Sequence, residues 1–291
     1  MKINEKSIIT NQEAVVGIVV TVLLIGLLMA VMVMLNTVYV PQWLEESEAS
    51  HMEDVSNQFT QLKYALDIQA LVNDSTSVTT SVTLGSKELP FFDSGRTFGS
   101  LDIDEDSFNI TIEQWNETTP VVITADSIRY TSGNSYFVNQ QYIYEAGALI
   151  LSQDESNVLY GKPSFFVDGY GNESTITFVI VNISGVGGKT SVSGYGTYPI
   201  YTQVTDIYPY YNGYIDLTNV TNITINTGYT NAWNKTIGST FLFHLDESHY
   251  TLTEVENDKI EIRFIDSSEK YYHLRYRIIN ISTQISSGIA E

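Results

Sequence analysis

Three patterns of apolar and polar positions divide the chain, and the first is a continuous apolar run. It extends from Ala14 to Leu35, and Thr21 is its only polar member. A helix rises about 1.5 Å per residue, so this run is long enough to cross a hydrocarbon core of roughly 30 Å. The apolar centre of a secretory signal is shorter, about 7–15 residues. We therefore predict a retained transmembrane helix over residues 14–40, in preference to a cleaved signal or a buried core helix.

The residues on either side of this run predict its orientation. Lys2 and Lys6 precede it, whereas the first charged residues after it are all acidic. Basic residues favour the cytoplasmic side of a membrane, and aromatic residues such as Tyr39 and Trp43 favour its interface. We therefore expect residues 1–13 to form a cytoplasmic leader and everything after the run to lie outside.

The second pattern is helical and amphipathic. Apolar residues recur at spacings of three and four, with polar residues between them; this seam consists of Met52, Val55, Phe59, Leu62 and Leu66. Such spacing places the apolar residues on one helix face. We predict an amphipathic stalk helix over residues 41–72 that packs on another helix or on the domain that follows. Pro41 leaves two alternatives, a kink in one continuous helix or the first turn of a second helix.

The third pattern alternates with a period of two and fills residues 73–291. Runs rich in Val, Ile, Thr, Tyr and Phe are separated by turns, as in SVTTSVTL, FNITIEQW, STITFVIVNIS, DKIEIRFID and YYHLRYRII. They predict a mainly β protein, in which an antiparallel β-sandwich-like exterior domain follows the transmembrane and stalk helix. The domain is one sandwich or two, with a candidate subdivision near 185–196, and NQQYIYEAGALILSQ is a hairpin or a short helix. We expect residues 75–291 to fold without the membrane helix.

Composition and charge narrow the function. The chain has 291 residues, a formal net charge of −20 and no Cys. This charge excludes a nucleic-acid binder that works by neutralising phosphates, and it argues against a domain that lies on anionic lipid. Without Cys there is no disulfide, no thiol catalysis and no thiolate metal site, so the stability of the exterior domain depends on its β core.

No group of residues indicates catalysis, so we predict that the protein is not an enzyme and binds no cofactor. The four His residues are scattered along the chain. The tripeptide GKT at 188–190 echoes a phosphate-binding loop, but Ile183 stands where that motif needs Gly. The acidic cluster at 102–106 leaves calcium binding open, with a solvated turn as the alternative.

Sequons of the type N-x-[ST] are dense after the apolar run. Such sites accept glycans in exported domains, so their distribution agrees with the predicted orientation. Plain polar positions on strand faces are the alternative for each one. The candidate glycan sites are Asn73, Asn109, Asn116, Asn172, Asn182, Asn219, Asn222, Asn234 and Asn280.

The apolar run also carries small residues at a spacing of four. Gly17 and Thr21 share one helix face, as do Gly26 and Ala30. Small residues at this spacing let helices approach each other closely within a membrane. Gly and Ala are also common in any membrane helix. The run is therefore interpreted either as a packing helix or as a simple anchor.

The start of the chain resembles archaeal type IV pilin-like cell-surface proteins. The resemblance rests on a short polar leader, on QEAVVG at residues 12–17 opening the apolar helix, and on the stalk, β-rich head and many sequons that follow. It is strongest over residues 1–70. Further on, GSKELPFFDSGRTFGSL and YEAGALILSQ look like segments of archaeal envelope proteins with this layout. The resemblance implies a class III signal, cut on the cytoplasmic side just before an apolar helix that the mature protein keeps.

Two functions follow from these patterns. The first is a membrane-anchored cell-envelope structural protein, a pilin-like subunit or minor pilin that assembles through its apolar helix with itself or with related envelope proteins. The second is a permanently anchored surface glycoprotein whose β domain binds a surface-layer component or a polysaccharide. In both, we expect a single-pass protein of the cell membrane with a cytoplasmic N-terminus and an extracellular C-terminal domain. Its partners then include the lipid bilayer and exclude nucleic acid.

Overall fold

The computed structural model describes residues 5–72, 75–86, 97–154, 156–170, 172–188, 190–209, 213–256, 258–265 and 270–286. Its helical elements are α1 (Glu5–Met34), the π-helical turn η1 (Leu35–Tyr39), α2 (Val40–Val72), α3 (Thr230–His244) and the short 3-10 turn η2 (Glu247–His249). Its first strands are β1 (Val78–Thr83), β2 (Phe98–Gln114), β3 (Val121–Gly133), β4 (Gln140–Glu145), β5 (Ala148–Gln153), β6 (Ser156–Gly161), β7 (Ser164–Tyr170) and β8 (Glu173–Gly185). The later strands are β9 (Ser191–Gly194), β10 (Thr197–Tyr208), β11 (Ile215–Leu217), β12 (Val220–Thr227), β13 (Tyr250–Glu256), β14 (Lys259–Phe264) and β15 (Tyr271–Ile285).

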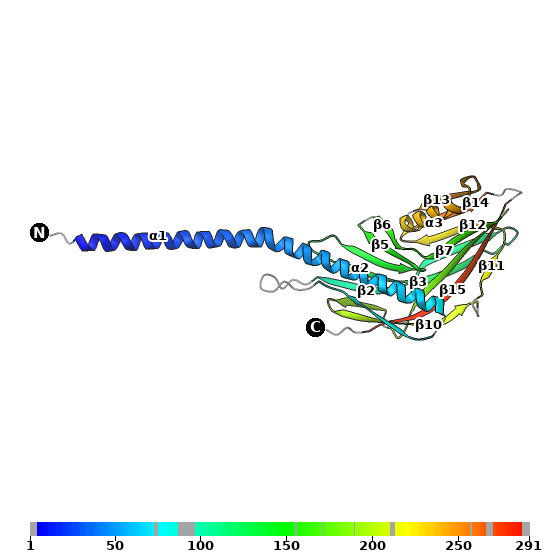
Figure 1. Ribbon diagram of the computed structural model, residues 1–291, viewed down its shortest axis with the longest axis horizontal. Helices are drawn as coiled ribbons and strands as arrows, with labels where there is room; N and C mark the ends of the chain where they lie inside the picture. The colour runs from blue at the N-terminus through cyan, green and yellow to red at the C-terminus, as the bar shows by residue number, and fades with distance from the viewer. Residues whose placement is uncertain are drawn as a thin grey trace.

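One long helical column projects from a β-rich head (Figure 1). The chain passes from α1 through η1 into α2 without leaving the helix. Asn36 Nδ2 donates to Met32 O at 3.0 Å and Thr37 Oγ1 donates to Val33 O at 2.7 Å, so the polar side chains of η1 are bonded to the preceding turn. Pro41 lacks an N–H and crowds the carbonyl four residues before it. We attribute the π-helical turn to this proline, which lies within a continuous helix.

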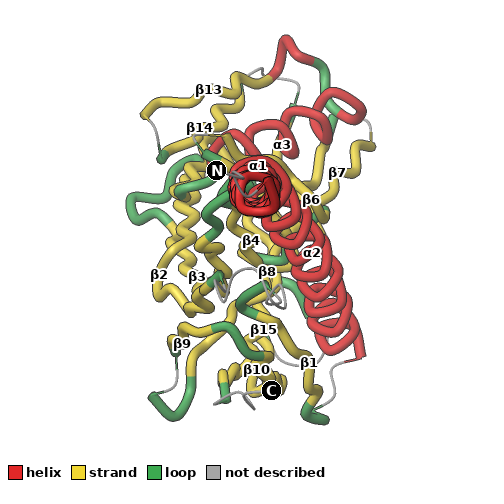
Figure 2. Tube along the Cα trace, turned by 90° about the vertical axis from the view of Figure 1, so that its left-hand side faces the viewer, coloured by secondary structure: helices red, strands yellow, loops and turns green. Residues whose placement is uncertain are grey.

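The described strands of the head form two sheets (Figures 1 and 2). One sheet has the order β1-β10-β15-β8-β7, with β11 also on β15, and the other has the order β13-β14-β12-β2-β3-β4-β5-β6, with β9 also on β2. The described pairings are antiparallel except that of β8 with β15, which run parallel from Glu173↔Tyr271 to Gly185↔Thr283. The prediction of a long N-terminal apolar helix followed by a mainly β, antiparallel head is confirmed.

Two hydrophobic clusters fill the head, and each takes its name here from the helix it contains. The α3 core includes Trp233 and Phe241, and the α2 core includes Phe59 and Leu62. The β4–β5 hairpin lies between the two cores, because its alternate residues belong to different ones: Tyr142, Tyr144 and Leu149 to the α2 core, and Ile143, Ala148 and Ile150 to the α3 core. A strand buried on both faces loses its polar alternation. This explains why the sequence of this segment fitted a hairpin and a short helix equally well.

The Gly-rich stretch at 185–196 does not separate the head into two units. Strands before and after it contribute to both cores, and β9 within it pairs with β2. The two cores are therefore not two successive segments of the chain.

Helix α2 forms a wall of the head. The residues of its predicted seam, Met52, Val55, Phe59, Leu62 and Leu66, are all buried in the α2 core. Because α2 covers this core, the structure argues against the expectation that residues 75–291 fold alone. That segment would expose the strand residues on which α2 packs.

Buried polar side chains fix α2 to the head near both of its ends. The Glu48 carboxylate accepts hydrogen bonds from the backbone N–H groups of Ser135, Tyr136 and Phe137 at 3.0, 2.8 and 2.6 Å. Toward the other end, Gln69 Nε2 donates to Thr202 O at 3.0 Å, and Thr202 Oγ1 donates to Gln69 Oε1 at 2.9 Å. Buried polar groups need such partners, so these contacts select one position of α2 on the sheets.

Candidate functional site

The projecting helix α1 is the first candidate site. It is the one helix among the described residues that is long and apolar enough to cross a membrane, and none of its most apolar window is buried. The small residues predicted for helix packing all lie on it. Apart from the adjacent residues and the backbone of α1 itself, no atom lies within 4 Å of a Cβ built on Gly17 or Gly26, so both positions are open to a neighbouring backbone.

The two pairs of small residues point to different sides of α1. Gly17 and Gly26 are nine residues apart, and at about 100° per residue they lie roughly half a turn from each other. Thr21 lies beside Gly17, and its Oγ1 donates to Gly17 O at 2.8 Å, so its polar group is satisfied within the helix. Ala30 lies beside Gly26. The helix thus has two opposed faces on which another helix could approach closely.

The predicted glycan sites lie in different surroundings. Asn73 falls outside the described residues. Asn182 Nδ2 donates to Asn280 Oδ1 at 2.9 Å, which joins these two sequons across β8 and β15, and Asn222 Nδ2 donates to Glu261 at 3.0 Å. Glycan attachment remains a prediction at every position. The others are the half-buried Asn109 and Asn234 and the exposed Asn116, Asn172 and Asn219.

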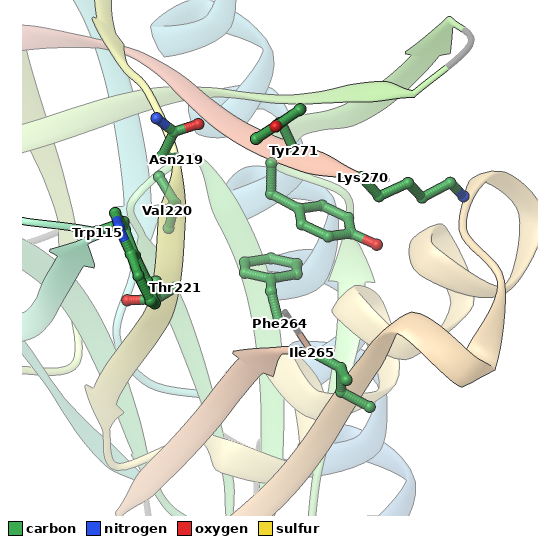
Figure 3. A pocket seen from close by; sticks show the side chains of 9 residues that line it. Trp115, Asn219, Val220, Thr221, Phe264, Ile265, Lys270 and Tyr271 are labelled. Atoms are coloured by element: carbon green, nitrogen blue, oxygen red, sulfur yellow. The ribbon is translucent and has the colours of Figure 1, made fainter. Parts of the chain in front are cut away.

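A pocket is the second candidate site (Figure 3). The strands that line it meet at the end of the head farthest from α1 (Figure 1). The pocket has a volume of about 250 Å³ and is lined from three separate parts of the chain: the turn after β2, the start of β12, and the segment where β14 ends and β15 begins. Its lining residues are Trp115, Asn219, Val220, Thr221, Phe264, Ile265, Lys270, Tyr271 and Tyr272. We call it the distal pocket.

Aromatic rings form the floor and the walls of the distal pocket. Phe264 and Tyr272 are buried and stacked, with ring centroids 4.4 Å apart and planes 17° from parallel. Trp115 and Tyr271 are 57% and 50% exposed. Figure 3 shows Trp115 at one side of the pocket, Phe264 between, and Lys270 at the other side. Solvent therefore reaches two large ring surfaces that are backed by a rigid aromatic pair.

Backbone contacts hold the Trp115 side of this pocket. Trp115 N–H donates to Asn219 O at 2.8 Å and joins the turn after β2 to the start of β12. Asn116 and Asn219 have φ values of 69° and 54°, a left-handed conformation that Asn tolerates better than most residues. Turn geometry is therefore a second reason for Asn at these two sequons.

The acidic cluster at 102–106 is divided among separate contacts. Asp102 accepts hydrogen bonds from Ser100 and Ser191, and Asp104 forms an ion pair with Arg129 at 2.9 Å. Among the described residues, no three His, Asp or Glu side chains gather as a metal site would require. The cluster therefore gives no geometric support to calcium binding.

Glu145 is the most perturbed acid in the head. Its Oε1 accepts hydrogen bonds from Thr227 Oγ1 at 2.7 Å and Trp233 Nε1 at 2.8 Å, whereas its buried Oε2 has no partner among the described residues. Burial raises the pKa of Glu145 to about 7, although the bonds from Thr227 and Trp233 act in the opposite direction. The residue lies inside the head, and no described pocket reaches it, so we assign it to stability and not to chemistry.

The sequence patterns located α1 but not the distal pocket. Trp115 is the last residue of the predicted strand run FNITIEQW, and an aromatic residue at the end of a strand beside a sequon was the available signal. The other walls come from segments more than a hundred residues away. The pairing of β2 with β12 and of β12 with β14 brings some of them together, and β15 contributes the rest from the other sheet.

Comparison with known proteins gives a family without an assigned activity. No curated protein and no solved structure gives a significant match to the chain. A family model described as "Family of unknown function (DUF7289)" matches residues 13–276, from the start of the apolar run into β15. Because this match covers most of the chain, the protein belongs to this family of unknown function, DUF7289.

Proposed function

We propose that this protein is a membrane-anchored structural protein of the cell envelope, a pilin-like subunit or minor pilin that assembles through α1. The observation that carries the proposal is the division of one helical column. Its first part is apolar and exposed from Val15 to Met34, and its second part is built into the core of the head. An exposed apolar surface of this size needs lipid or other apolar helices around it.

The arrangement of small residues supports assembly over simple anchoring. In hydrocarbon, helices gain no hydrophobic free energy from each other, so they associate through close packing at small residues. Because the pair at Gly17 and the pair at Gly26 face opposite sides of α1, the helix could pack between two neighbours at once. Contacts on two opposite faces extend into larger assemblies, whereas one self-complementary face closes as a dimer.

The orientation proposed for the chain places the leader in the cytoplasm and the head outside the cell. Protease added to intact cells should then remove the head, and protection of the head until the membrane is broken would contradict this arrangement. In the proposed setting, α1 sits in the membrane before assembly and packs with other helices after it.

Substitution on the two faces of α1 tests assembly. Gly26→Ile fills one open face without shortening the apolar run, and Gly17→Ile fills the other. Leu27→Ile is the matched control, because it keeps an exposed aliphatic residue of the same size one position away. We expect both glycine variants to insert into membranes normally but to lose cross-linked higher-order assemblies, while the control keeps them. Assemblies that survive both glycine variants would leave only an anchor.

A further inference from the structure

The distal pocket has the features of a small-ligand site and no role in anchoring or assembly through α1. The strands that line it meet at the opposite end of the molecule from that helix (Figure 1). Pockets for drug-sized ligands usually measure about 300–1,000 Å³ and combine an apolar lining with a few polar groups. At about 250 Å³, the distal pocket has room for one ring of a ligand and not for a large cofactor.

The walls favour a ligand with one flat apolar face. Trp115 and Tyr271 expose about half of their surfaces at the rim, and the stacked pair of Phe264 and Tyr272 prevents the floor from collapsing. Exposed aromatic faces stack on the C–H faces of sugar rings, which are apolar above and below and polar around the edge. The backbone bond from Trp115 to Asn219 keeps the Trp side of the pocket in place without a ligand.

One polar group lies beside Trp115 and another lies at the far side of the pocket. Asn219 and Lys270 line the same pocket from different elements. Tyr272 is 3% exposed, and its buried hydroxyl has no hydrogen-bond partner among the described residues. Because this hydroxyl is shielded from solvent, we assign it no contact with the ligand.

The net charge of the molecule favours neutral sugars over acidic ones. A formal net charge of −20 repels polyanions, so uronic-acid and sulfated polymers are disfavoured. We propose that the distal pocket binds the ring of a neutral sugar, stacked on Trp115 with Asn219 beside it.

Two sources can supply this ring. One is a surface polysaccharide outside the cell, and the other is a glycan attached to the protein itself at Asn219, whose sequon lines the pocket. Both present the same chemistry to Trp115. The experiment below separates them by using protein with and without attached glycans.

The first arm uses the full chain made in a host that does not attach N-glycans, held in a detergent without a sugar headgroup. Short oligosaccharides of glucose, mannose and N-acetylglucosamine are titrated while Trp fluorescence is recorded, with oligogalacturonate as the acidic comparison. We expect a saturable change with at least one neutral sugar and a weaker response to oligogalacturonate. No response to any neutral sugar, or a stronger response to the acidic one, would overturn the proposal.

Variants locate the binding. Trp115→Ala removes the exposed ring. The affinity of this variant for the neutral sugar, measured by calorimetry, should be about tenfold weaker or lost. Phe98→Ala is the matched control, because Phe98 is a similarly exposed aromatic at the opposite end of β2. Its binding should stay unchanged. Equal binding by wild type and Trp115→Ala would contradict the proposed site.

The second arm uses the chain purified from its native source. If a glycan is attached at Asn219 and occupies the pocket, mass spectrometry finds it there, and wild type does not respond to added sugar. Thr221→Ala, which removes the sequon but keeps the Asn219 side chain, then does respond. If the ligand is an external polysaccharide, Asn219 carries no glycan and wild type responds as the unglycosylated chain does. A native chain with no glycan at Asn219 and no response would contradict both sources.

Discussion

The two halves of the N-terminal helical column show how the same backbone geometry can serve opposite surroundings. In α1 the described apolar side chains, from Val15 to Met34, are exposed. In α2 the apolar side chains follow a seam, and those of the seam are buried against the sheets. The difference lies in the sequence pattern and not in the helix. Apolar residues all round require a surrounding apolar phase, whereas an apolar stripe requires one facing surface.

The polar side chains of α1 and α2 also differ in where they find hydrogen-bond partners. Along α1, Thr21 bonds to its own helix, so no partner outside the helix is needed. Along α2, Glu48 and Gln69 bond to backbone groups of the head. A helix whose polar side chains bond within the helix can change its neighbours without losing hydrogen bonds. A helix whose polar side chains bond to the head loses those bonds if it moves away.

The largest expected effect comes from truncating the chain, either between α1 and α2 or after both helices. A chain beginning at residue 40 keeps α2 and should be soluble and folded, with a β-type circular dichroism spectrum. A chain beginning at residue 75 loses Phe59, Leu62 and Leu66 from the core. Each such loss costs about 2–5 kcal/mol, and their sum rivals the roughly 5–15 kcal/mol stability of a whole domain.

We therefore expect residues 75–291 to aggregate or to lack a cooperative unfolding transition. A cooperative transition of this shorter chain, at the same denaturant concentration as that of residues 40–291, would show that α2 is dispensable. The comparison between the two halves would then rest on α1 alone.

A single core residue of α2 gives the next largest effect. Phe59 is fully buried, with its ring 6.3 Å from that of Tyr130 and 5.9 Å from that of Tyr142. Phe59→Ala should reduce the free energy of unfolding of the head by about 3–5 kcal/mol. Chemical denaturation followed by circular dichroism measures it. Met29→Ala in α1, where the side chain is 64% exposed, should leave the unfolding of the head unchanged.

The polar attachment of α2 should matter somewhat less. Glu48→Ala leaves three backbone N–H groups without their carboxylate, and we expect a loss of about 2–4 kcal/mol. Hydrogen exchange should show faster opening at Ser135–Phe137. Glu46→Ala, on the exposed side of the same helix, should change stability by less than about 0.5 kcal/mol. Equal effects of the two substitutions would mean that the contact of Glu48 is not a significant restraint.

The smallest expected effect is the dependence of stability on pH, which tests the α3 core and not the α2 core. Burial raises the pKa of Glu145, in the α3 core, from 4.5 to about 7. Its contribution to stability is complete below pH 4.5 and is lost as the pH rises through about 7, a change of at most about 3 kcal/mol. Glu145→Gln should remove this part of the pH dependence, which denaturation at pH 5 and pH 8 measures. Glu113→Gln, an exposed control on β2, should keep it.

The elements that could be predicted from the sequence are those whose pattern lies within one continuous segment of the chain. The apolar run of α1, the seam of α2 and the alternation of β2, β8 and β15 are local patterns, and the structure has those elements. Helix α3 was not predicted, because its Thr, Ile, Phe and Trp residues have low helix propensity. Its Trp233, Ile237 and Phe241 repeat every four residues and are buried, so packing against the sheets stabilises it.

Long-range arrangement explains the remaining failures. The parallel pairing of β8 with β15 joins segments about a hundred residues apart, and no local pattern specifies it. The distal pocket depends on such pairings, so Trp115, Tyr271 and Lys270 carried no signal as a group. By contrast, the small residues of α1 could be placed from the sequence, because helical spacing alone sets which of them share a face.

The two polar attachments of α2 also determine how the molecule bears force. A pull on α1 away from the head acts along α2, which is fixed near one end by Glu48 and near the other by Gln69. Such a load shears the contacts along the length of α2 together and does not peel them apart one turn at a time. Under such a load, we therefore expect the head to resist detachment from its helix until many contacts fail at once.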